Sequence, residues 1–315
     1  MSVGNWNYCK KIYIYDSTLR DGAQGEGISF TLSDKVNLTM RLDDFGTDYI
    51  EAGNPGSNPK DMEYFDRIRK VKLKNSKLVA FGSTRRANTK VNEDDNILSL
   101  LRAETPAIAV FGKSWDFHVN SIIRTTLDEN LRMISETVGF MKEKGKEVIF
   151  DAEHFFDGYK SNPDYALHTL KAAQDAGADW LVLCDTNGGS FPWEIGDITG
   201  KISNILEAPI GIHTHNDCGM AVANSIMAVQ NGASQVQGTI NGYGERCGNA
   251  NLCTIIPNLQ LKRKYCLIDD CKIKSLTQLS RFVSEVANIS HNEYGPYVGN
   301  NAFAHKGGMH IDAVL

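Results

Sequence analysis

The feature that most constrains the fold of this chain is an alternation of strand-like and helical segments at a step of ~30 residues. The strand-like segments are short and apolar, and the helical ones are longer and amphipathic. Eight such pairs favour a parallel (β/α)8 barrel, a fold of the α/β class. A doubly wound open sheet is the alternative, but no Gly-x-Gly-x-x-Gly motif follows the first strand. We expect strands at residues 12–16, 48–53, 77–82, 107–111, 147–151, 180–184, 210–213 and 235–240, and helices at residues 33–45 (capped by Ser33), 60–74, 93–103, 127–144, 164–176, 192–206, 220–231 and 250–262.

The barrel pattern stops near Lys264, which divides the chain in two. We assign residues 1–264 to a TIM-barrel catalytic domain and residues 265–315 to a C-terminal linker or subdomain segment. Residues 275–288 predict one more helix, and residues 294–310 are rich in glycine and aromatic side chains. Disordered tails carry few aromatic or apolar groups, so we expect this segment to dock on another surface.

Composition excludes several classes of partner. A net charge of −5 gives no basic footprint for nucleic acid. No apolar run approaches the ~20 residues that a membrane-spanning helix needs, and residues 1–11 lack the apolar centre of a signal peptide. The seven cysteines show no zinc-finger spacing, and their number is odd. We therefore expect free thiols in a cytoplasmic protein without a membrane partner.

Polar side chains gather where the predicted strands end. In a (β/α)8 barrel the carboxyl ends of the strands form the active-site face, and the loops that follow them carry the catalytic groups. We therefore predict that these residues form one group at that rim: Asp16, Glu51, Asp151, Glu153, Asp185, His213 and Asn241.

Two histidines at the end of the seventh predicted strand are candidate metal ligands. His213 and His215 are two positions apart, so their side chains point to the same face of a strand. Two neutral imidazoles in this arrangement can bind one divalent cation. The alternative is a pair of polar residues that close a strand and hydrogen-bond to backbone.

The loop after the first strand supplies a carboxylate and a guanidinium. Asp21 offers a third ligand, and two imidazoles with one carboxylate leave open positions for substrate and water on Mg²⁺, Mn²⁺ or Zn²⁺. Arg20 offers a fork of donors for a carboxylate or an oxyanion. An Arg–Asp pair in a surface turn is the alternative, and the His-x-His pair expected on the same rim favours the metal site.

Three motifs in the chain resemble a known family. They are Asp-Ser-Thr-Leu-Arg-Asp-Gly-Ala-Gln at residues 16–24, His-Thr-His-Asn-Asp at residues 213–217 and Gly-Tyr-Gly-Glu-Arg-Cys-Gly-Asn-Ala-Asn-Leu at residues 242–252. In this order and spacing they resemble the TIM-barrel metallolyases related to isopropylmalate, homocitrate and citramalate synthases, a family that also includes hydroxymethylglutaryl-CoA lyases. A closer resemblance to the citramalate synthases is carried by residues 25–30, 53–59, 111–118 and 150–159.

The resemblance implies a Claisen-type condensation of acetyl-CoA with pyruvate, followed by thioester hydrolysis to citramalate and CoA, a step toward isoleucine. The family pattern makes Asp21, His213 and His215 metal ligands and places Asn249 near the metal, directly or through water. It assigns to Arg20 the stabilisation of negative charge on the keto oxygen. Thr186 is expected to hold the substrate carboxylate, and Glu153 lies where the family has a glutamate on the acetyl-CoA side.

The resemblance also concerns the end of the chain. The segment Gly-Gly-Met-His-Ile-Asp at residues 307–312 is similar to a family segment that supplies a catalytic histidine and aspartate from a neighbouring subunit. It implies that His310, supported by Asp312, acts as the base across the interface of a homodimer. Full-length synthases carry a C-terminal regulatory domain, and we expect this chain to be the catalytic portion without it.

Other functions remain open at this point. The same chemistry with a larger 2-oxo acid would make a 2-isopropylmalate or homocitrate synthase. A retro-aldol lyase of the hydroxymethylglutaryl-CoA type is another possibility, although Cys247 lies in a loop that matches the synthases and not the lyases. A barrel that binds metal without catalysis is the last alternative.

Overall fold

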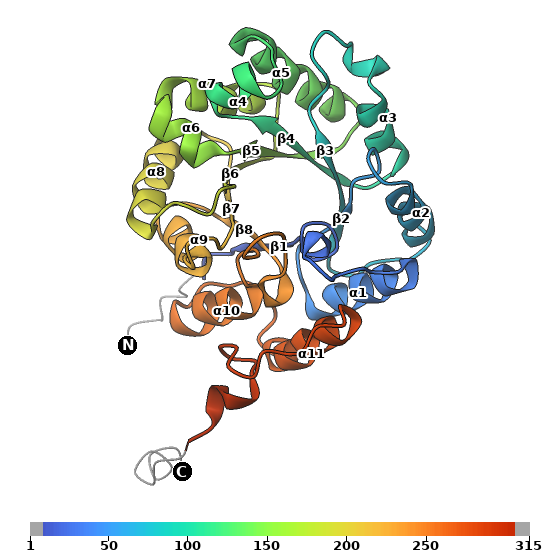
Figure 1. The fold of residues 1–315 in the computed structure, drawn as a ribbon, viewed down its shortest axis with the longest axis vertical. Coiled ribbons are helices and arrows are strands. Elements are labelled where there is room, and N and C mark those ends of the chain that lie inside the picture. Colours follow the sequence, from blue (N-terminus) through green and yellow to red (C-terminus); the bar gives the residue numbers. More distant parts are fainter. Residues whose placement is uncertain (1–8, 306–315) are drawn as a thin grey trace, which may run out of the picture.

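The computed structural model describes residues 9–305, and these form a closed barrel of eight parallel strands surrounded by helices (Figure 1). Each strand pairs with its neighbours in chain order, and pairing of Tyr13 with Gln235 closes the ring between the first and last strands. The predicted (β/α)8 barrel is confirmed. The strands are β1 Tyr13–Asp16, β2 Tyr49–Gly53, β3 Lys77–Ser83, β4 Ala107–Lys113, β5 Glu147–Glu153, β6 Trp180–Asp185, β7 Ile210–Thr214 and β8 Gln235–Gly238.

The helices cover the outside of the ring, where their apolar faces pack on the outward side chains of the strands. They are α1 Leu32–Phe45, α2 Pro59–Ile68, α3 Asp95–Arg102, α4 Asp116–Ser121, α5 Leu127–Glu143, α6 Phe155–Ser161, α7 Pro163–Asp175, α8 Pro192–Ile205, α9 Ala221–Gln230, α10 Leu252–Pro257 and α11 Leu276–Val286. None of these described helices combines the length and the apolar character needed to cross a bilayer.

The helices differ from the prediction in several respects. Helix α1 begins after Thr31, whose side chain and that of Asp34 form a reciprocal capping box, so the predicted cap at Ser33 is wrong. Helices α4 and α6 were not predicted, because one or two turns are too short to show a helical period. The helix expected at residues 250–262 is divided, since Leu252–Pro257 is followed by a π-helix at Asn258–Lys262.

Alternate strand residues face the interior of the barrel, as the two-residue period of a strand requires. An interior cluster runs through the strands and includes Tyr15, Tyr49, Val79, Trp180 and Cys184. The residues between them point outward and join the larger core beneath the helices. This parity decides which rim side chains reach the centre of the barrel.

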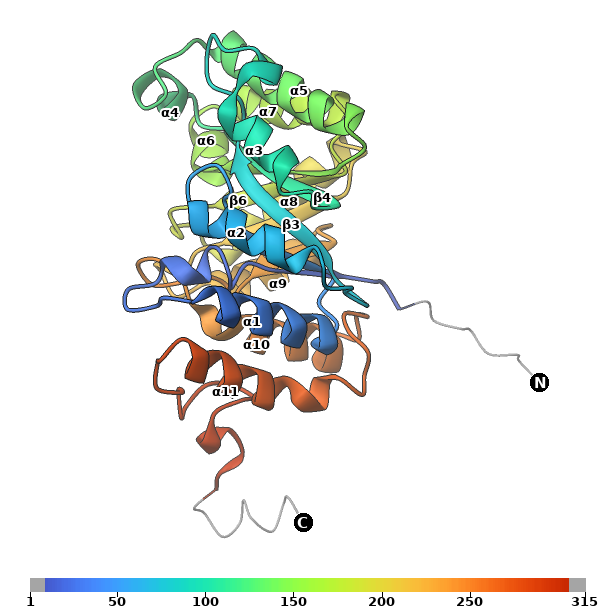
Figure 2. The same ribbon diagram turned by 90° about the vertical axis from the view of Figure 1, so that its right-hand side faces the viewer.

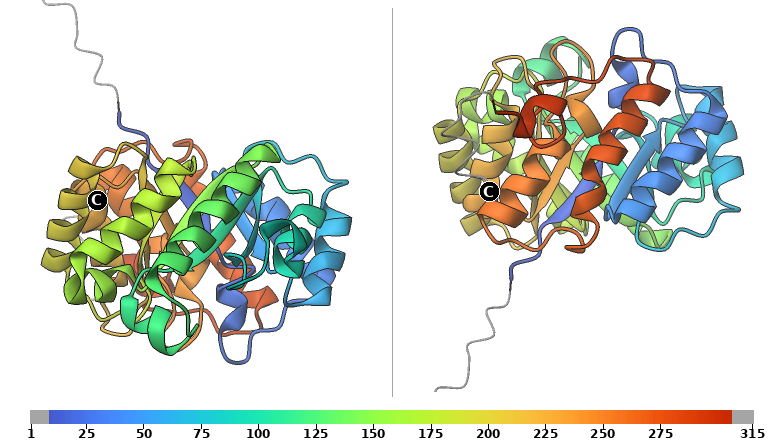
Figure 3. Two further views of the ribbon diagram at one scale, coloured as in Figure 1. Left: turned by 90° about the horizontal axis from the view of Figure 1, so that it is seen from above. Right: turned by 90° about the horizontal axis from the view of Figure 1, so that it is seen from below.

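The segment after the barrel returns to pack on it. Helix α11 lies beside α1, as Figures 1 and 3 show, and the Arg41 guanidinium lies 5.1 Å from the centre of the Phe282 ring. Farther along, Val298 is buried and the Tyr297 hydroxyl donates to the side chain of Asn258. The division of the chain at residue 264 stays a prediction.

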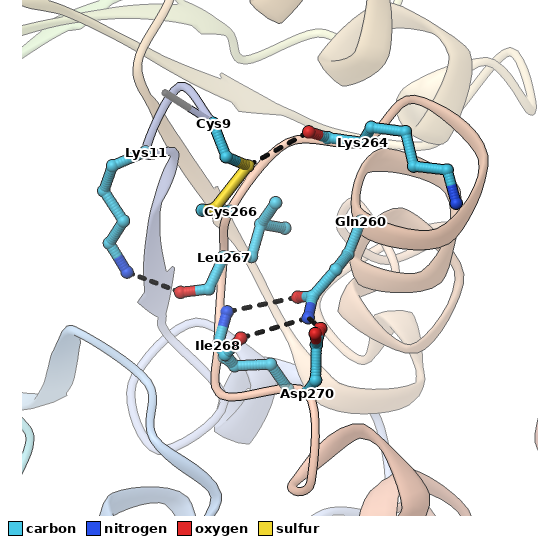
Figure 4. Close-up of a disulfide and its surroundings, with 8 residues drawn as sticks. All are labelled: Cys9, Lys11, Gln260, Lys264, Cys266, Leu267, Ile268 and Asp270. Carbon is cyan, nitrogen blue, oxygen red and sulfur yellow. Dashed lines mark hydrogen bonds between the residues drawn. A yellow bond between two sulfur atoms is a disulfide. The ribbon is translucent and has the colours of Figure 1, made fainter. Parts of the chain in front are cut away.

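A disulfide joins the residues before β1 to those after the eighth helical unit (Figure 4). Cys9 and Cys266 are 257 positions apart in sequence, and their Cα atoms are 5.6 Å apart. The backbone supports the pairing, because Cys266 N–H donates to Lys10 and Ile12 N–H donates to Cys266. The expectation of free thiols is therefore wrong for these two cysteines, since closure of the barrel brings together residues that no local spacing connects. The free cysteines are 184, 218, 247, 253 and 271.

The disulfide lies at the end of the barrel where the strands begin, because Cys9 precedes β1 and the backbone of Lys11 pairs with that of Cys266. Figure 2 shows the barrel from the side, with α11 below α1. The candidate site described below lies at the opposite end, beyond the carboxyl ends of the strands. A crosslink across so long a loop restricts the unfolded chain and is typically worth about 2–4 kcal/mol. It therefore acts on the stability of the barrel.

Candidate active site

Three side chains meet above the carboxyl ends of the strands. Asp21 lies in the loop after β1, His213 in β7 and His215 directly after it, and all three are buried. Their nearest ligand atoms lie within 4.8 Å of one another. The Nε2 atoms of the two histidines are 3.2 Å apart, and His213 Nε2 is 3.6 Å from Asp21 Oδ2. The structure thus brings the three predicted ligands together.

The protonation of this group suits a divalent cation. Burial and the neighbouring His215 lower the pKa of His213 to about 3, and burial also lowers the pKa of His215. For Asp21 burial opposes ionisation, but Arg20, the two histidines and a hydrogen bond from Asn249 together outweigh it and hold the pKa below its usual value. At neutral pH the group is therefore two neutral imidazoles and one carboxylate. Two imidazole nitrogens that face each other at 3.2 Å need a proton or a cation between them, so the donor set fits a metal.

The loop after β1 places Asp21 through its own backbone. The amide groups of Arg20, Asp21 and Gly22 all donate to the carbonyl of Ser17, at 2.9–3.1 Å. Asp16 stabilises the start of this turn by accepting from the backbone and hydroxyl of Thr18. Asp16 is therefore a structural residue of the loop.

Arg20 is held beside the metal-binding group by three contacts. Its Nε donates to Glu51 Oε1 at 2.5 Å, and its guanidinium carbon lies 3.8 Å from the centre of the Phe81 ring. A terminal guanidinium nitrogen lies 3.5 Å from Asp21 Oδ2. Glu51 in turn accepts from the buried Tyr15 hydroxyl at 2.5 Å. These contacts leave the guanidinium rigid, with its remaining N–H groups available for an oxyanion.

Sequence reasoning included Glu51 among the rim residues but missed its pairing with Arg20 and Tyr15. The signal was present in the sequence, because Glu51 is an acid inside the apolar strand β2 and has the same parity as Tyr49, an interior residue. A buried carboxylate in such a position requires a partner.

A cavity of about 220 Å³ adjoins the candidate metal ligands. Its walls include six of the predicted site residues: Arg20, Asp21, Glu153, Thr186, His213 and His215. Phe81 and Phe111 form an aromatic wall, with ring centres 5.2 Å apart. Asp151 also lines the cavity, where it accepts from Gln237, and burial followed by the charge of Glu51 raises its pKa to about 8.

The prediction that seven polar rim residues form one group is partly wrong. Asp151, Glu153 and His213 line the cavity, and Glu51 lies against Arg20. Asp16, Asp185 and Asn241 do not line it. Asp185 accepts from Ser190, and the Asn241 amide donates to Ser280 of α11. Asp16 and Asp185 have the outward parity of their strands, which explains their absence from the cavity.

Asn249 lies next to the site without lining the cavity. It is 2% exposed, its backbone pairs with that of His215, and its amide donates to the carbonyl of Tyr243. The turn around it needs glycine, because a Cβ on Gly244 would lie 2.2 Å from Asn249 Nδ2 at a φ of +153°. Its contact with a metal, direct or through water, stays a prediction.

The structure describes the predicted residue Glu153 but not the predicted base. Glu153 is paired with Lys113, its register partner on β4, and both side chains lie at the rim. His310 and Asp312 lie outside the described residues, so the expected base is not placed. The roles assigned to the individual site residues stay predictions.

Fold and site together define a class: a (β/α)8 barrel with two histidines and one aspartate at its carboxyl rim that could hold a metal ion. The sequence profile described as HMGL-like matches residues 11–283. The chain belongs to the HMGL-like family.

Individual relatives within and near this family are similar to the chain over most of its length. The chain is 59% identical over 307 residues to the (R)-citramalate synthase of Aquifex aeolicus, covering 97% of this chain and 58% of that protein. It is 55% identical over 303 residues to the (R)-citramalate synthase of Geobacter sulfurreducens, covering 96% and 57%. A 2-isopropylmalate synthase of Caldanaerobacter subterraneus is 35% identical over 313 residues, with 97% and 76% covered. The predicted resemblance to citramalate synthases is confirmed, and the chain spans 57–58% of the length of the first two relatives.

Solved structures agree on the fold. A hydroxymethylglutaryl-CoA lyase from Bacillus subtilis matches with a TM-score of 0.75 at 19% identity, over 90% of this chain and 96% of that one. The lyase from Brucella melitensis matches with a TM-score of 0.73 at 18% identity, over 89% and 99%. At this identity the match supports the barrel architecture alone.

Proposed function

We propose that this chain is the catalytic barrel of an acyltransferase of the citramalate synthase type, which condenses acetyl-CoA with pyruvate and hydrolyses the thioester to release CoA. The observation that carries the proposal is the group of Asp21, His213 and His215 beside Arg20 in one small cavity. The similarity to proteins named (R)-citramalate synthase supports it. A cytoplasmic location is part of the same proposal.

Each site residue has a separate role in the proposed reaction. Asp21, His213 and His215 would hold Mg²⁺, Mn²⁺ or Zn²⁺, with Asn249 close by, and a bound cation would supply Lewis-acid polarisation of the keto group. Arg20 donates to the keto oxygen as negative charge develops there. Thr186 binds the carboxylate of the 2-oxo acid. Glu153 faces the acetyl group, whose methyl loses a proton before its carbon attacks the keto carbon.

We assign a second cavity to the larger co-substrate. It measures about 560 Å³ and shares Arg20, Gln24 and Phe81 with the reaction cavity. Its other walls come from the loop before α1 and from the start of α2, including Phe30 and Asn58. This position supports the entry of acetyl-CoA from the side of α1 and α2.

The protein is expected to use pyruvate faster than 2-oxoisovalerate. The cavity is small and has a stacked aromatic wall, and each additional methyl group in an apolar pocket changes the transition-state energy by ~1–3 kcal/mol. Release of CoA from acetyl-CoA, followed with a thiol reagent across a panel of 2-oxo acids, measures this preference.

The same panel separates the alternatives. Faster turnover of 2-oxoisovalerate or 2-oxoglutarate would contradict the pyruvate preference and indicate isopropylmalate or homocitrate synthesis. Cleavage of hydroxymethylglutaryl-CoA without condensation would indicate a lyase. Metal binding with no reaction on any substrate would leave a non-catalytic barrel.

We further propose that His310, supported by Asp312, removes the methyl proton in the neighbouring subunit of a homodimer. The histidines of the candidate metal group are occupied as ligands, which leaves the base to another residue. A mixture of inactive His310→Ala and His213→Ala proteins is expected to recover part of the wild-type activity after subunit exchange, because a hybrid contains one site with both groups intact.

The control for this experiment is exchange itself, followed with fluorescently labelled subunits. If exchange occurs and the mixture remains inactive, His310 does not act across the interface.

A further inference from the structure

The residues that follow β5 make contacts that the proposed reaction does not explain. Glu153 ends the strand, and His154 adopts a left-handed backbone with φ 56° and ψ 33°, an uncommon conformation for a residue with a side chain. Helix α6 begins directly afterwards. It packs so closely on the preceding rim segment that a Cβ on Gly158 would lie 2.3 Å from the carbonyl oxygen of Ser114. The sharp turn at His154 lets α6 start in this position.

The backbone of His154 determines the direction of a hydroxyl group in the cavity. His154 N–H donates to Thr186 Oγ1 at 2.9 Å, and Thr186 lines the cavity. A hydroxyl has one hydrogen, and within residues 9–305 the Thr186 hydroxyl donates it to no acceptor. Because one lone pair is taken by the amide, the hydroxyl hydrogen is left to serve a ligand in the cavity.

The side chain of His154 supports the contact with Thr186 from outside the cavity. Its Nδ1 lies 3.2 Å from Asp157 Oδ2, and that oxygen also accepts from the amide of Asn187 at 2.9 Å. Asn187 follows Thr186 in the chain. The His118 ring packs edge-on against the His154 ring, with centres 4.4 Å apart. The loops after β5 and β6 are thus joined through Asp157.

We propose that His154 is a positioning residue: together with Asp157 it holds the Thr186 hydroxyl as a hydrogen-bond donor to the carboxylate of the 2-oxo acid. This proposal rests on the proposed function. It concerns the binding of the 2-oxo acid alone, since neither His154 nor Asp157 lines the cavity or belongs to the candidate metal ligands. Acetyl-CoA and metal binding are therefore independent readouts.

The test measures pyruvate affinity by calorimetry on Mn²⁺-loaded protein. His154→Gly keeps the backbone N–H and the left-handed conformation but removes the imidazole. Asp157→Asn keeps the shape and weakens the hydrogen bond. Both are expected to raise the Kd for pyruvate about threefold to tenfold, and Thr186→Val about tenfold or more, because a hydrogen bond to a charged group is lost.

A double variant tests whether His154 acts through Thr186 or through a general effect on the structure. The double variant His154→Gly with Thr186→Val is expected to bind pyruvate no more weakly than Thr186→Val alone, since both changes affect one contact. The KM for acetyl-CoA and the bound metal should stay at wild-type values. Glu104→Gly is the matched control, because Glu104 also has a positive φ of 54° but lies in the loop before β4.

The results distinguish failure of the positioning role from failure of the proposed function. Wild-type protein that does not bind pyruvate would refute the proposed function and this inference with it. Wild-type binding with an unchanged Kd in both His154→Gly and Asp157→Asn, or additive losses in the double variant, would overturn the positioning role alone. If circular dichroism shows that His154→Gly does not fold, Asp157→Asn decides the result.

Discussion

Replacing His213 by alanine is expected to remove the bound divalent metal and to lower turnover by about 10³-fold or more. His213 contributes one of three donors that lie within 4.8 Å of one another, and its Nε2 faces both other members of the group. Without it, one imidazole and one carboxylate hold the cation too weakly to polarise a keto group. Metal content by mass spectrometry and CoA release measure the two effects.

The fold should survive this change. His213 makes its contacts at the rim, and the barrel core beneath it is formed by other side chains. Asp21→Ala should give the same loss of metal and activity from a different loop. His168→Ala, a change of an exposed histidine on α7, is the matched control and should leave both at wild-type levels. Stoichiometric metal with full activity in either site variant would show that the assignment of the metal ligands is wrong.

Replacing Arg20 by lysine is expected to lower kcat by about 10²–10³-fold while the metal stays bound. Lysine keeps the charge but cannot donate to Glu51, approach Asp21 and lie flat on the Phe81 ring at the same time. The loss should fall mainly on kcat, because the contact with the keto oxygen strengthens as charge develops in the transition state. Steady-state kinetics with pyruvate and acetyl-CoA provide the measurement.

Arg41→Lys is the matched control for this change. Its guanidinium also lies over a phenylalanine ring, that of Phe282, but on α1 and α11 away from the cavity. Its kcat should equal that of the wild type. An Arg20→Lys protein with wild-type kcat, or one that has lost its metal, would contradict the role proposed for Arg20.

Much of the fold was available from short-range patterns. Strands and helices of this barrel have distinct periods of two and about 3.6 residues, and both are visible in a window of ten to fifteen residues. The strand boundaries therefore differ from the prediction by at most two residues, as at β5, where the strand continues to Glu153. Helices α4 and α6 contain too few residues to show such a period.

Some features of the candidate site were likewise predictable from local sequence, and others depend on the fold. His213 and His215 are two positions apart, so their shared direction follows from strand geometry alone, and the loop after the first strand suggested Asp21 and Arg20. The resemblance to a known family added Thr186 and Asn249 and gave Glu153 its expected role. The pairing of Glu51 with Arg20 and Tyr15 depends on the sheet, which brings side chains of β1, β2 and β3 to one point. The exclusion of Asp16 and Asp185 from the cavity depends on their outward parity in that ring.

Sequence alone thus determined the repeated units of the fold and supplied the candidate site residues, because both depend on residues close together in the chain. The tertiary structure decided which residues far apart in the chain come into contact. Closure of the barrel brought Cys9 against Cys266 across 257 positions, and the pairing of β5 with β6 joined His154 to Thr186. Such contacts have no local signature, since they arise only when parallel strands far apart in sequence are brought side by side by the hydrogen bonds of the sheet.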